Sequence, residues 1–488
     1  MKRLLCLLVV SLLCIAAAAQ TAVVTRNVNL RPDASTNNDP IELLKPPAQV
    51  TLVESGQTAG FYHVTTPDGK TGFVWAKNVK IQSVAGLPTP GAAPGTASVS
   101  ANIPSPRIAK DQPVDWWFVF KFNAASFPGC AGNAKPACPF GGTVQSFAAS
   151  SQQYAFASSV SKVLHAGTGC AGDTVTDPVG ATFDEIYNGT LNYVVWNDQF
   201  YQDPELCGGS DSCGAPWGHS KGVLAWNEDG DGVVMQVTTP DWPGSGNKNF
   251  PRKSEGNSLD CTQSDNDILV SQHFFSVKLT KDDVLKVLGA LHNADVVTDP
   301  ANQQIVKSGG PADIQALVSE LGKHSGNTSV TVALLSTGIK LISKPSALHA
   351  PPWQVVSATL DGVDLRTATW WANPKIPTTT SSTTIACWDP SLGKPGAVEI
   401  ATSGHFGGKT IGLKGTATTS GNHAKLGVSI SGTHHYAIFG DMNQQGAISG
   451  NCKSSQNGRG GLFFVVDDAQ LADSVKDLLT GDTAPTGP

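Results

Sequence analysis

A short pattern, His-x-Lys followed by a run of apolar residues, occurs twice in this chain and limits how it can fold. The first copy is His219-Ser220-Lys221 and the second is His423-Ala424-Lys425. A histidine and a lysine two residues apart on a strand point to the same face of the sheet. Each copy is followed, after a second apolar stretch, by a polar turn that contains Asp241 or Asn443. The repetition in matching context predicts two similar halves that share one site.

The residue types in this pattern suit phosphoryl chemistry. An imidazole can serve as nucleophile or acid, and an ammonium group beside it is a fixed cation for phosphate oxygens. Two half-sites of this kind make one complete site around a phosphodiester. The chain contains no Walker loop, Gly-x-Ser-x-Gly elbow or dinucleotide fingerprint that would compete for the function. We therefore expect the catalytic residues to be His219, Lys221, His423, Lys425 and Asn443.

The chain contains several segments with a recognisable order, at 112–121, 196–199, 218–224, 271–275, 423–425, 440–443 and 458–461. Through these segments the region from Gln112 to Asp467 resembles the deoxyribonuclease II family. Two departures concern the site: Leu426 follows the second pattern where animal members usually have tryptophan, and Asp241 stands where asparagine is frequent. The cysteine spacing also differs.

The resemblance implies an α/β fold of the phospholipase D type, a pseudo-dimeric sandwich of two similar halves. It also implies a metal-independent endonuclease without a cofactor, which acts on DNA through a covalent phosphohistidine. One histidine attacks phosphorus, the other protonates the leaving 5′-oxygen, and water then releases a 3′-phosphate end. We favour His219 as the nucleophile, although the residues alone leave the choice open.

Two residues are expected to bind substrate, Gln272 and Asp241. Glutamine recurs in the family at position 272, and the neighbouring His273 must then face the other way on a strand, where it is a structural residue. Asp241 lies in the turn after the first half-site, and a plain turn is the competing interpretation. His434 and His435 are expected in a loop, and 227–232 is expected to be a hairpin turn instead of a calcium loop.

The N-terminal part predicts export and a separate small domain. Lys2-Arg3, a short apolar run and four alanines predict a signal peptide over residues 1–19, so we expect a secreted or periplasmic protein without a membrane anchor. The segments 29–32 and 69–74 make residues 20–82 resemble a bacterial Src-homology-3-like β-barrel. Either cell-wall peptide binding or a spacer role fits such a domain. A Pro/Ala/Gly-rich linker is expected over 83–110, a catalytic domain over 111–480 and a flexible tail over 481–488. The oligomeric state stays open.

The cysteines favour disulfides over a structural zinc. Cys6 and Cys14 lie in the signal segment, and no Cys-x-x-Cys pair occurs in the chain. An even number of cysteines in an exported protein is typical of disulfide bonding. Two pairs are close enough in sequence for local loops, but the connectivity stays open. These pairs are Cys130 with Cys138 and Cys207 with Cys213.

The net charge at first argues against a DNA-binding enzyme. It is −6 with neutral histidines, and loss of Lys2 and Arg3 makes it more negative by two. The chain also contains 11 histidines, and their protonation below the ordinary histidine pKa would make the balance positive. An acidic working pH therefore reconciles the composition with a polyanionic substrate.

Apolar periodicity predicts the elements that surround these motifs. Helices are expected at 281–292, 311–324 and 468–479. Strands are expected at 116–122, 191–196, 223–226, 233–237, 274–279, 329–335, 353–360, 426–430, 436–439 and 462–466.

Two alternatives to a nuclease remain at this level. One is a phospholipase D-like phosphodiesterase that acts on lipid headgroups. The other is a cell-wall-binding protein whose nuclease domain has decayed, although both His-x-Lys pairs are intact.

Overall fold

The computed structural model describes residues 21–58, 60–82, 103–127, 153–172, 174–200, 204–210, 212–240 and 269–487. The predicted signal peptide, residues 83–102 of the predicted linker, Asp241 and the pair Cys130 and Cys138 lie outside these ranges. The chain divides into two compact units, Met1–Val99 and Ser100–Pro488. Each unit is described by itself.

The first unit is all β. Its main sheet has the order β6-β5-β4-β1-β7, and β2 pairs with β3. Alternate residues of the short strands point into a small apolar core, as in β2, where Val28 and Leu30 are buried on either side of Asn29. The hairpin between β5 and β6 turns at Gly69, whose φ of 87° favours glycine. The elements are β1 (Thr21–Val24), β2 (Val28–Leu30), β3 (Glu42–Leu44), β4 (Gln49–Thr58), β5 (Phe61–Thr65), β6 (Thr71–Trp75), η1 (Ala76–Asn78) and β7 (Val79–Gln82).

The second unit begins with an eight-stranded antiparallel sheet of order β12-β11-β10-β16-β15-β14-β13-β17. Its central strands are buried along their whole length, which explains their almost continuous apolar sequences. The strands are β10 (Trp116–Lys121), β11 (Tyr154–Ser158), β12 (Ser161–Ala166), β13 (Asn192–Asn197), β14 (Lys221–Trp226), β15 (Gly232–Val237), β16 (Gln272–Leu279) and β17 (Val306–Lys307). A small ribbon of β8 (Arg107–Ala109) and β9 (Gln112–Pro113) precedes them.

A seven-stranded sheet of order β18-β19-β26-β25-β24-β20-β21 follows. All its pairs are antiparallel except β20 with β21. The strands are β18 (Thr331–Leu334), β19 (Lys340–Lys344), β20 (Leu365–Ala368), β21 (Val398–Ile400), β24 (Leu426–Ser429), β25 (Tyr436–Gly440) and β26 (Gly461–Asp467). A separate hairpin is formed by β22 (Ser403–Phe406) and β23 (Lys409–Gly412).

The two sheets repeat the same arrangement. The order β10-β16-β15-β14-β13 in the first corresponds to β19-β26-β25-β24-β20 in the second. Helix α1 directly precedes β13 and α4 precedes β20, so these two helices correspond. Helix α2 follows β16 and α5 follows β26, so these two correspond as well. The helices are α1 (Pro178–Asn188), α2 (Lys281–Asn293), α3 (Ala312–Val318), α4 (Pro352–Thr359) and α5 (Ala469–Leu479), with short turns η2 (Pro204–Cys207), η4 (Ser346–Leu348), η5 (Pro390–Leu392) and η6 (Ser455–Gly458).

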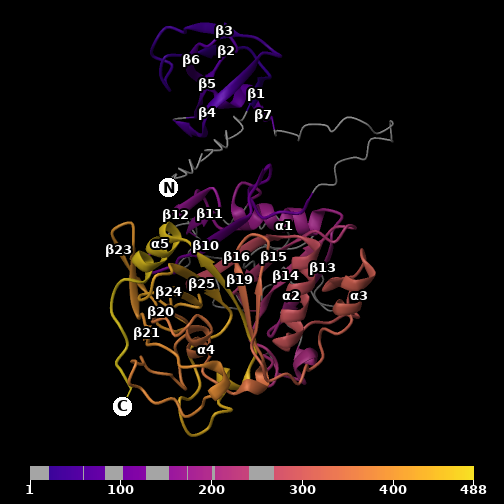
Figure 1. Ribbon diagram of the computed structural model, residues 1–488, viewed down its shortest axis with the longest axis vertical. Coiled ribbons are helices and arrows are strands. Elements are labelled where there is room, and N and C mark those ends of the chain that lie inside the picture. The colour runs from indigo at the N-terminus through magenta and orange to yellow at the C-terminus, as the bar shows by residue number, and fades with distance from the viewer. Residues whose placement is uncertain are drawn as a thin grey trace, which may run out of the picture. The chain divides into compact units, whose positions relative to one another are not determined.

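The two sheets lie beside each other and share one core, as Figure 1 shows for β10 and β16 of the first sheet and β19 and β25 of the second. Aromatic rings meet at this interface: the Phe439 ring lies 4.4 Å from both the Phe118 and the Phe275 rings, measured between centroids. Strand alternation places Phe464 on the shared face and Phe463 on the opposite one, where it packs against Trp353 of α4. The halves therefore form one packed body.

Four expectations about local structure differ from what the structure shows. Residues 353–360, predicted as a strand, form α4, because Pro352 occupies the first helical turn and the apolar face packs on the second sheet. Arg107, predicted in the linker, belongs to β8 and binds Glu185 of α1 at 2.7 Å. The predicted flexible tail is hydrogen-bonded to the sheet, with Arg366 binding the Gly481 carbonyl and the Thr483 hydroxyl. The predicted helix at 311–324 is limited to α3.

Candidate active site

The two His-x-Lys patterns meet in one pocket of about 470 Å³. The first pattern leads into β14 and the second into β24, the corresponding strands of the two sheets. Because these sheets face each other, residues far apart in sequence line a common cavity. The five residues predicted to be catalytic all line it, namely His219, Lys221, His423, Lys425 and Asn443.

Each histidine is held by the other half of the unit. The His219 backbone N–H donates to the Gly460 carbonyl at 2.8 Å, and the His423 N–H donates to the Ser271 carbonyl at 2.7 Å. Gly460 precedes β26 and Ser271 precedes β16, which are corresponding strands. The same backbone hydrogen bond is thus made twice across the interface, once from the first half to the second and once from the second half to the first.

Two buried lysines stabilise the segments that make these bonds. Lys121 ends β10 and donates to the Val270 carbonyl at 2.7 Å, while Lys344 ends β19 and donates to the Arg459 carbonyl at 2.7 Å. Both side chains are almost fully buried. Burial lowers the pKa of the Lys344 ammonium to about 7. Because Val270 and Arg459 come directly before Ser271 and Gly460, these lysines fix the loops that position the histidines.

The two imidazoles have different partners. The Nδ1 atom of His219 lies 2.7 Å from the Asp441 carbonyl oxygen. The Nδ1 atom of His423 lies 3.3 Å from the side-chain amide of Gln272, and its ring meets the Trp370 ring edge-on with centroids 4.1 Å apart. A carbonyl oxygen only accepts hydrogen bonds, whereas the Gln272 atom that faces His423 is the amide nitrogen Nε2, which only donates; Oε1 of Gln272 accepts from Thr238 at 2.7 Å. The two histidines are therefore set up for different protonation behaviour.

Both histidines are poor bases in this pocket. Burial lowers the pKa of His219 well below its ordinary value of 6.5, and the nearby Lys221 charge lowers it further, against a raising effect of Asp198. The pKa of His423 is also lowered well below 6.5, by burial first and then by Lys425 and Lys221. The free protein at neutral pH consequently holds both imidazoles in the neutral form.

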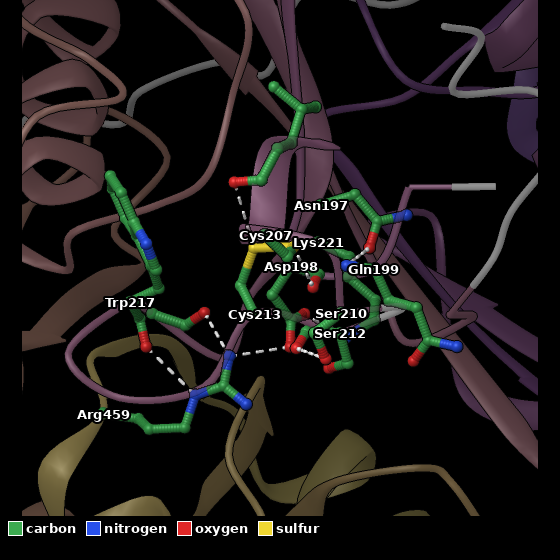
Figure 2. The surroundings of a disulfide bond; sticks show 12 residues. Asn197, Asp198, Gln199, Cys207, Ser210, Ser212, Cys213, Trp217, Lys221 and Arg459 are labelled. Carbon is green, nitrogen blue, oxygen red and sulfur yellow. Dashed lines mark hydrogen bonds and ion pairs between the residues drawn. A yellow bond between two sulfur atoms is a disulfide. The ribbon is translucent and has the colours of Figure 1, made fainter. Parts of the chain in front are cut away.

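Asp198 joins two cations of the site. Its Oδ1 atom lies 2.5 Å from the Lys221 ammonium, and its Oδ2 atom lies 2.8 Å from Nη2 of Arg459 (Figure 2). The Asp198 carboxyl is buried, which alone would raise its pKa, but the charges of Lys221, His219 and Arg459 outweigh burial and hold that pKa below its usual range. Asp198 is thus an anion that fixes the position of Lys221.

The backbone of Asp198 is held by a disulfide-closed loop. The Cys207–Cys213 bond, one of the two local pairs that the sequence allowed, closes this loop, and the Cys213 N–H donates to the Asp198 carbonyl at 2.7 Å. Figure 2 shows the disulfide beside Asp198 and Lys221. A second disulfide, Cys387–Cys452, is closed over a longer stretch of sequence.

The position in the second half that corresponds to Asp198 holds a different kind of residue. Asn197 pairs with Lys221, and Ala368 pairs with Leu426, the residue after Lys425. The register therefore places Trp370 where the first half has Asp198. The Lys425 ammonium instead donates to the His423 carbonyl at 2.5 Å. The two half-sites are alike in backbone but not in chemistry.

A buried polar network connects the half-sites beneath the pocket. Asp441 accepts from Ser220 Oγ at 2.6 Å and from Gln236 Nε2 at 2.9 Å. Gln236 also contacts His273 Nε2 at 3.2 Å, and the Lys425 backbone N–H donates to His273 Nδ1 at 3.1 Å. Burial raises the pKa of Asp441 to about 7 despite these hydrogen bonds. His273 faces away from the pocket in this network, while the adjacent Gln272 faces His423.

The remaining residues predicted from the sequence lie partly in the pocket and partly in turns. Asn443 lines the pocket, and its Nδ2 atom donates to Gln445 at 3.0 Å. Asp241 lies outside the described residues. His434 lies in the turn between β24 and β25, with Nδ1 2.6 Å from Asp467. The turn at 227–232 joins β14 to β15.

Sequence reasoning did not select Asp198, Arg459, Trp370 or Asp441 as members of the site. Asp198 and Arg459 lie in segments that resemble the family, and this resemblance is the sequence signal that could have indicated their role. Trp370 had no such signal, because only the strand register brings it to His423.

Among the described residues, no group of three or more histidine, cysteine or acidic side chains is placed to hold a metal ion. The described helices also include none with the length and apolar character needed to cross a membrane.

The fold and pocket together define a hydrolase-type site in which two similar halves each contribute a histidine and a lysine. The family model for deoxyribonuclease II matches residues 105–481, and the chain belongs to this family. It is a deoxyribonuclease-type endonuclease within a mixed α/β unit. No curated protein matches the chain.

Proposed function

We propose that the protein is a secreted, metal-independent endodeoxyribonuclease that cleaves DNA through a phosphohistidine and leaves 3′-phosphate ends. The observation that carries this proposal is the convergence of both His-x-Lys pairs on one pocket. The ammonium groups of Lys221 and Lys425 lie beside the two imidazoles, where they can bind the non-bridging oxygens of one phosphate. The repeated strand order also supports a fold of the phospholipase D type.

The donor set of the pocket favours fixed cations over a divalent metal. Its lining contains Lys221, Lys425 and Arg459, and the one carboxylate among the described lining residues, Asp198, is already paired with two of them. A divalent metal bound through carboxylates would have to replace these ion pairs. The lysines supply the positive charge that a metal would otherwise provide to the phosphorane-like transition state.

The hydrogen bonds support His219 as the nucleophile. The Asp441 carbonyl accepts from Nδ1–H of His219, so Nε2 keeps its lone pair in the neutral ring. That lone pair attacks phosphorus, and the bond from phosphorus to the 5′-oxygen breaks. The Gln272 amide nitrogen faces Nδ1 of His423 as a donor, so the proton that His423 exchanges is carried on its own Nε2. His423 is therefore suited to give a proton to the leaving oxygen and to take one from the water that hydrolyses the phosphohistidine.

Cleavage of plasmid DNA is expected to continue in excess chelator, because the phosphate is neutralised by lysines. The measurement is conversion of supercoiled plasmid to nicked and linear forms with EDTA or with Mg²⁺. A magnesium-dependent nuclease in the same buffer is the control for effective chelation. Activity that disappears with EDTA and returns with Mg²⁺ would refute the metal-independent mechanism.

The pH dependence of kcat/KM is expected to be bell-shaped with its maximum below pH 6.5. The mechanism needs one neutral and one protonated histidine, and both pKa values are lowered below 6.5. As pH rises to neutrality His423 loses the proton it must donate, so the rate falls. At sufficiently low pH His219 is also protonated and cannot attack. A profile of plasmid cleavage that rises steadily into the alkaline range would contradict this assignment.

The disulfide bonds support the proposed location of the protein. Cys207–Cys213 and Cys387–Cys452 fit an oxidising compartment, in agreement with a secreted or periplasmic protein.

We propose that the first unit is a Src-homology-3-like barrel that binds cell-wall peptide. A pocket of about 420 Å³ lined by Arg31, Leu43 and Trp75 supports a binding role, and co-sedimentation with purified cell walls tests it.

A further inference from the structure

We propose that Arg459 is a third phosphate-binding cation of the active site and that Asp198 positions it together with Lys221. The inference rests on the proposed nuclease function and extends it to a residue outside the His-x-Lys patterns. It predicts that one guanidinium nitrogen of Arg459 binds a phosphate oxygen of DNA in the pocket.

The hydrogen bonds of Arg459 leave one part of its guanidinium available. Nε donates to the Trp217 carbonyl at 3.0 Å, and Nη2 donates to the Gly218 carbonyl at 2.8 Å and to Asp198 at 2.8 Å. Nη1 has no hydrogen-bond partner within the described part of the chain, and Figure 2 shows it without a dashed line. Since Arg459 lines the pocket, this nitrogen is a donor for a ligand there.

The fixed geometry of the side chain suits phosphate recognition. Arg459 comes from the loop before β26 in the second half, yet its guanidinium donates to first-half residues: Trp217 and Gly218, which directly precede His219, and Asp198. With only 7% of the residue exposed, the guanidinium plane has little freedom to move. A guanidinium held in this way binds phosphate with little further loss of side-chain entropy.

Comparison of the two halves argues against a purely structural role. Lys121 pairs with Gln272, and Lys344 pairs with Gly461, so the register makes Val270 the counterpart of Arg459. Val270 is fully buried and makes the same backbone contact with its lysine as Arg459 does. The fold thus accepts an apolar side chain at this position. The arginine adds a charge that the backbone arrangement does not require.

Asp198 has a defined part in this arrangement. Without it, the ammonium of Lys221 and the guanidinium of Arg459 would repel each other in a buried site. With one oxygen on each cation, Asp198 holds both at the pocket wall and leaves the net charge of the lining positive. Asp198 is therefore a positioning residue, and Arg459 is the group that meets the substrate.

The test is to measure cleavage of plasmid DNA and inhibition by inorganic phosphate in the full-length protein. Arg459→Lys is expected to lower kcat/KM about 10-fold and Arg459→Met about 100-fold, as for loss of one preorganised donor to a phosphoryl group. The inhibition constant for phosphate is expected to rise in both variants. A solely structural arginine would lower the melting temperature without changing phosphate inhibition in the protein that remains folded.

Arg366→Lys is the matched control. Arg366 is also a buried second-half arginine that binds backbone carbonyls, but it contacts Leu479 and Gly481 and does not line the pocket. Its replacement should leave kcat/KM and phosphate inhibition unchanged. Wild-type kcat/KM and phosphate inhibition in folded Arg459→Lys would overturn the inference, and this variant decides the question if Arg459→Met does not fold. Failure of the nuclease proposal is distinct, because the wild-type protein would then not cleave DNA.

Discussion

Replacing His219 or His423 by alanine is expected to lower the rate of DNA cleavage about 1,000-fold or more in each case. In the proposed mechanism the two side chains act on the same phosphate, one as nucleophile and the other as acid, so loss of either stops the same reaction. For such a unit the effects of single mutations are far from additive. The double variant should consequently be little slower than either single variant.

The measurement is single-turnover cleavage of plasmid DNA by the three variants at the pH of maximum activity. His434→Ala is the control, because His434 is an exposed histidine in the turn between β24 and β25, paired with Asp467. Its removal should leave the rate close to that of the wild type. A His219 or His423 variant that keeps a large part of the activity would show that the histidines do not share one site.

Replacing Asp198 by alanine is expected to impair both stability and activity. Asp198 is 1% exposed and pairs with Lys221 and Arg459, whose side chains are themselves almost buried. Removal of one member of a buried ion network leaves the remaining charges uncompensated, which typically costs about 3–5 kcal/mol of folding free energy. Lys221 would also lose its fixed position, so we expect kcat to fall by about 100-fold.

Thermal unfolding and plasmid cleavage of the purified variant measure the two effects. Glu399→Ala is the matched control, since Glu399 pairs with Arg366 at 3.0 Å but is 38% exposed, and such a pair contributes about 1 kcal/mol or less. Its melting temperature and activity should stay near those of the wild type. An Asp198→Ala protein as stable and active as Glu399→Ala would contradict the role assigned to the network.

The strands around the site follow well from sequence, whereas one helix does not. The apolar runs that form β14, β15 and β16 are short and bounded by turns, and they are buried on both faces as such runs predict. The run 353–360 has the same apolar character but forms α4. Here Pro351 and Pro352, which set a helix start, were the better guide than hydrophobicity.

Some residues of the site can be predicted from local sequence patterns, whereas others come together only through long-range contacts. His219, Lys221, His423 and Lys425 belong to a pattern that repeats within a few residues, so the sequence displays it. Asp198 and Arg459 form an ion pair across 261 positions of sequence, and no local spacing indicates such a pair. Lys121 and Lys344 are single lysines at the ends of apolar strands, and their equivalence becomes visible only through the pairing of β10 with β16 and of β19 with β26.

The exchanged backbone bonds of the two histidines have a consequence for how such a protein can be built. An isologous interface between identical subunits makes every contact twice, with residue i of each copy bound to residue j of the other. The bonds from His219 to Gly460 and from His423 to Ser271 obey this rule within one chain. The described part of the second unit therefore repeats, within one chain, the contact pattern of a C2 interface. Because both halves belong to one chain, their sequences can differ at equivalent positions. The first half has Asp198 and Val270 where the second half has Trp370 and Arg459. Two identical half-length chains could not encode this difference.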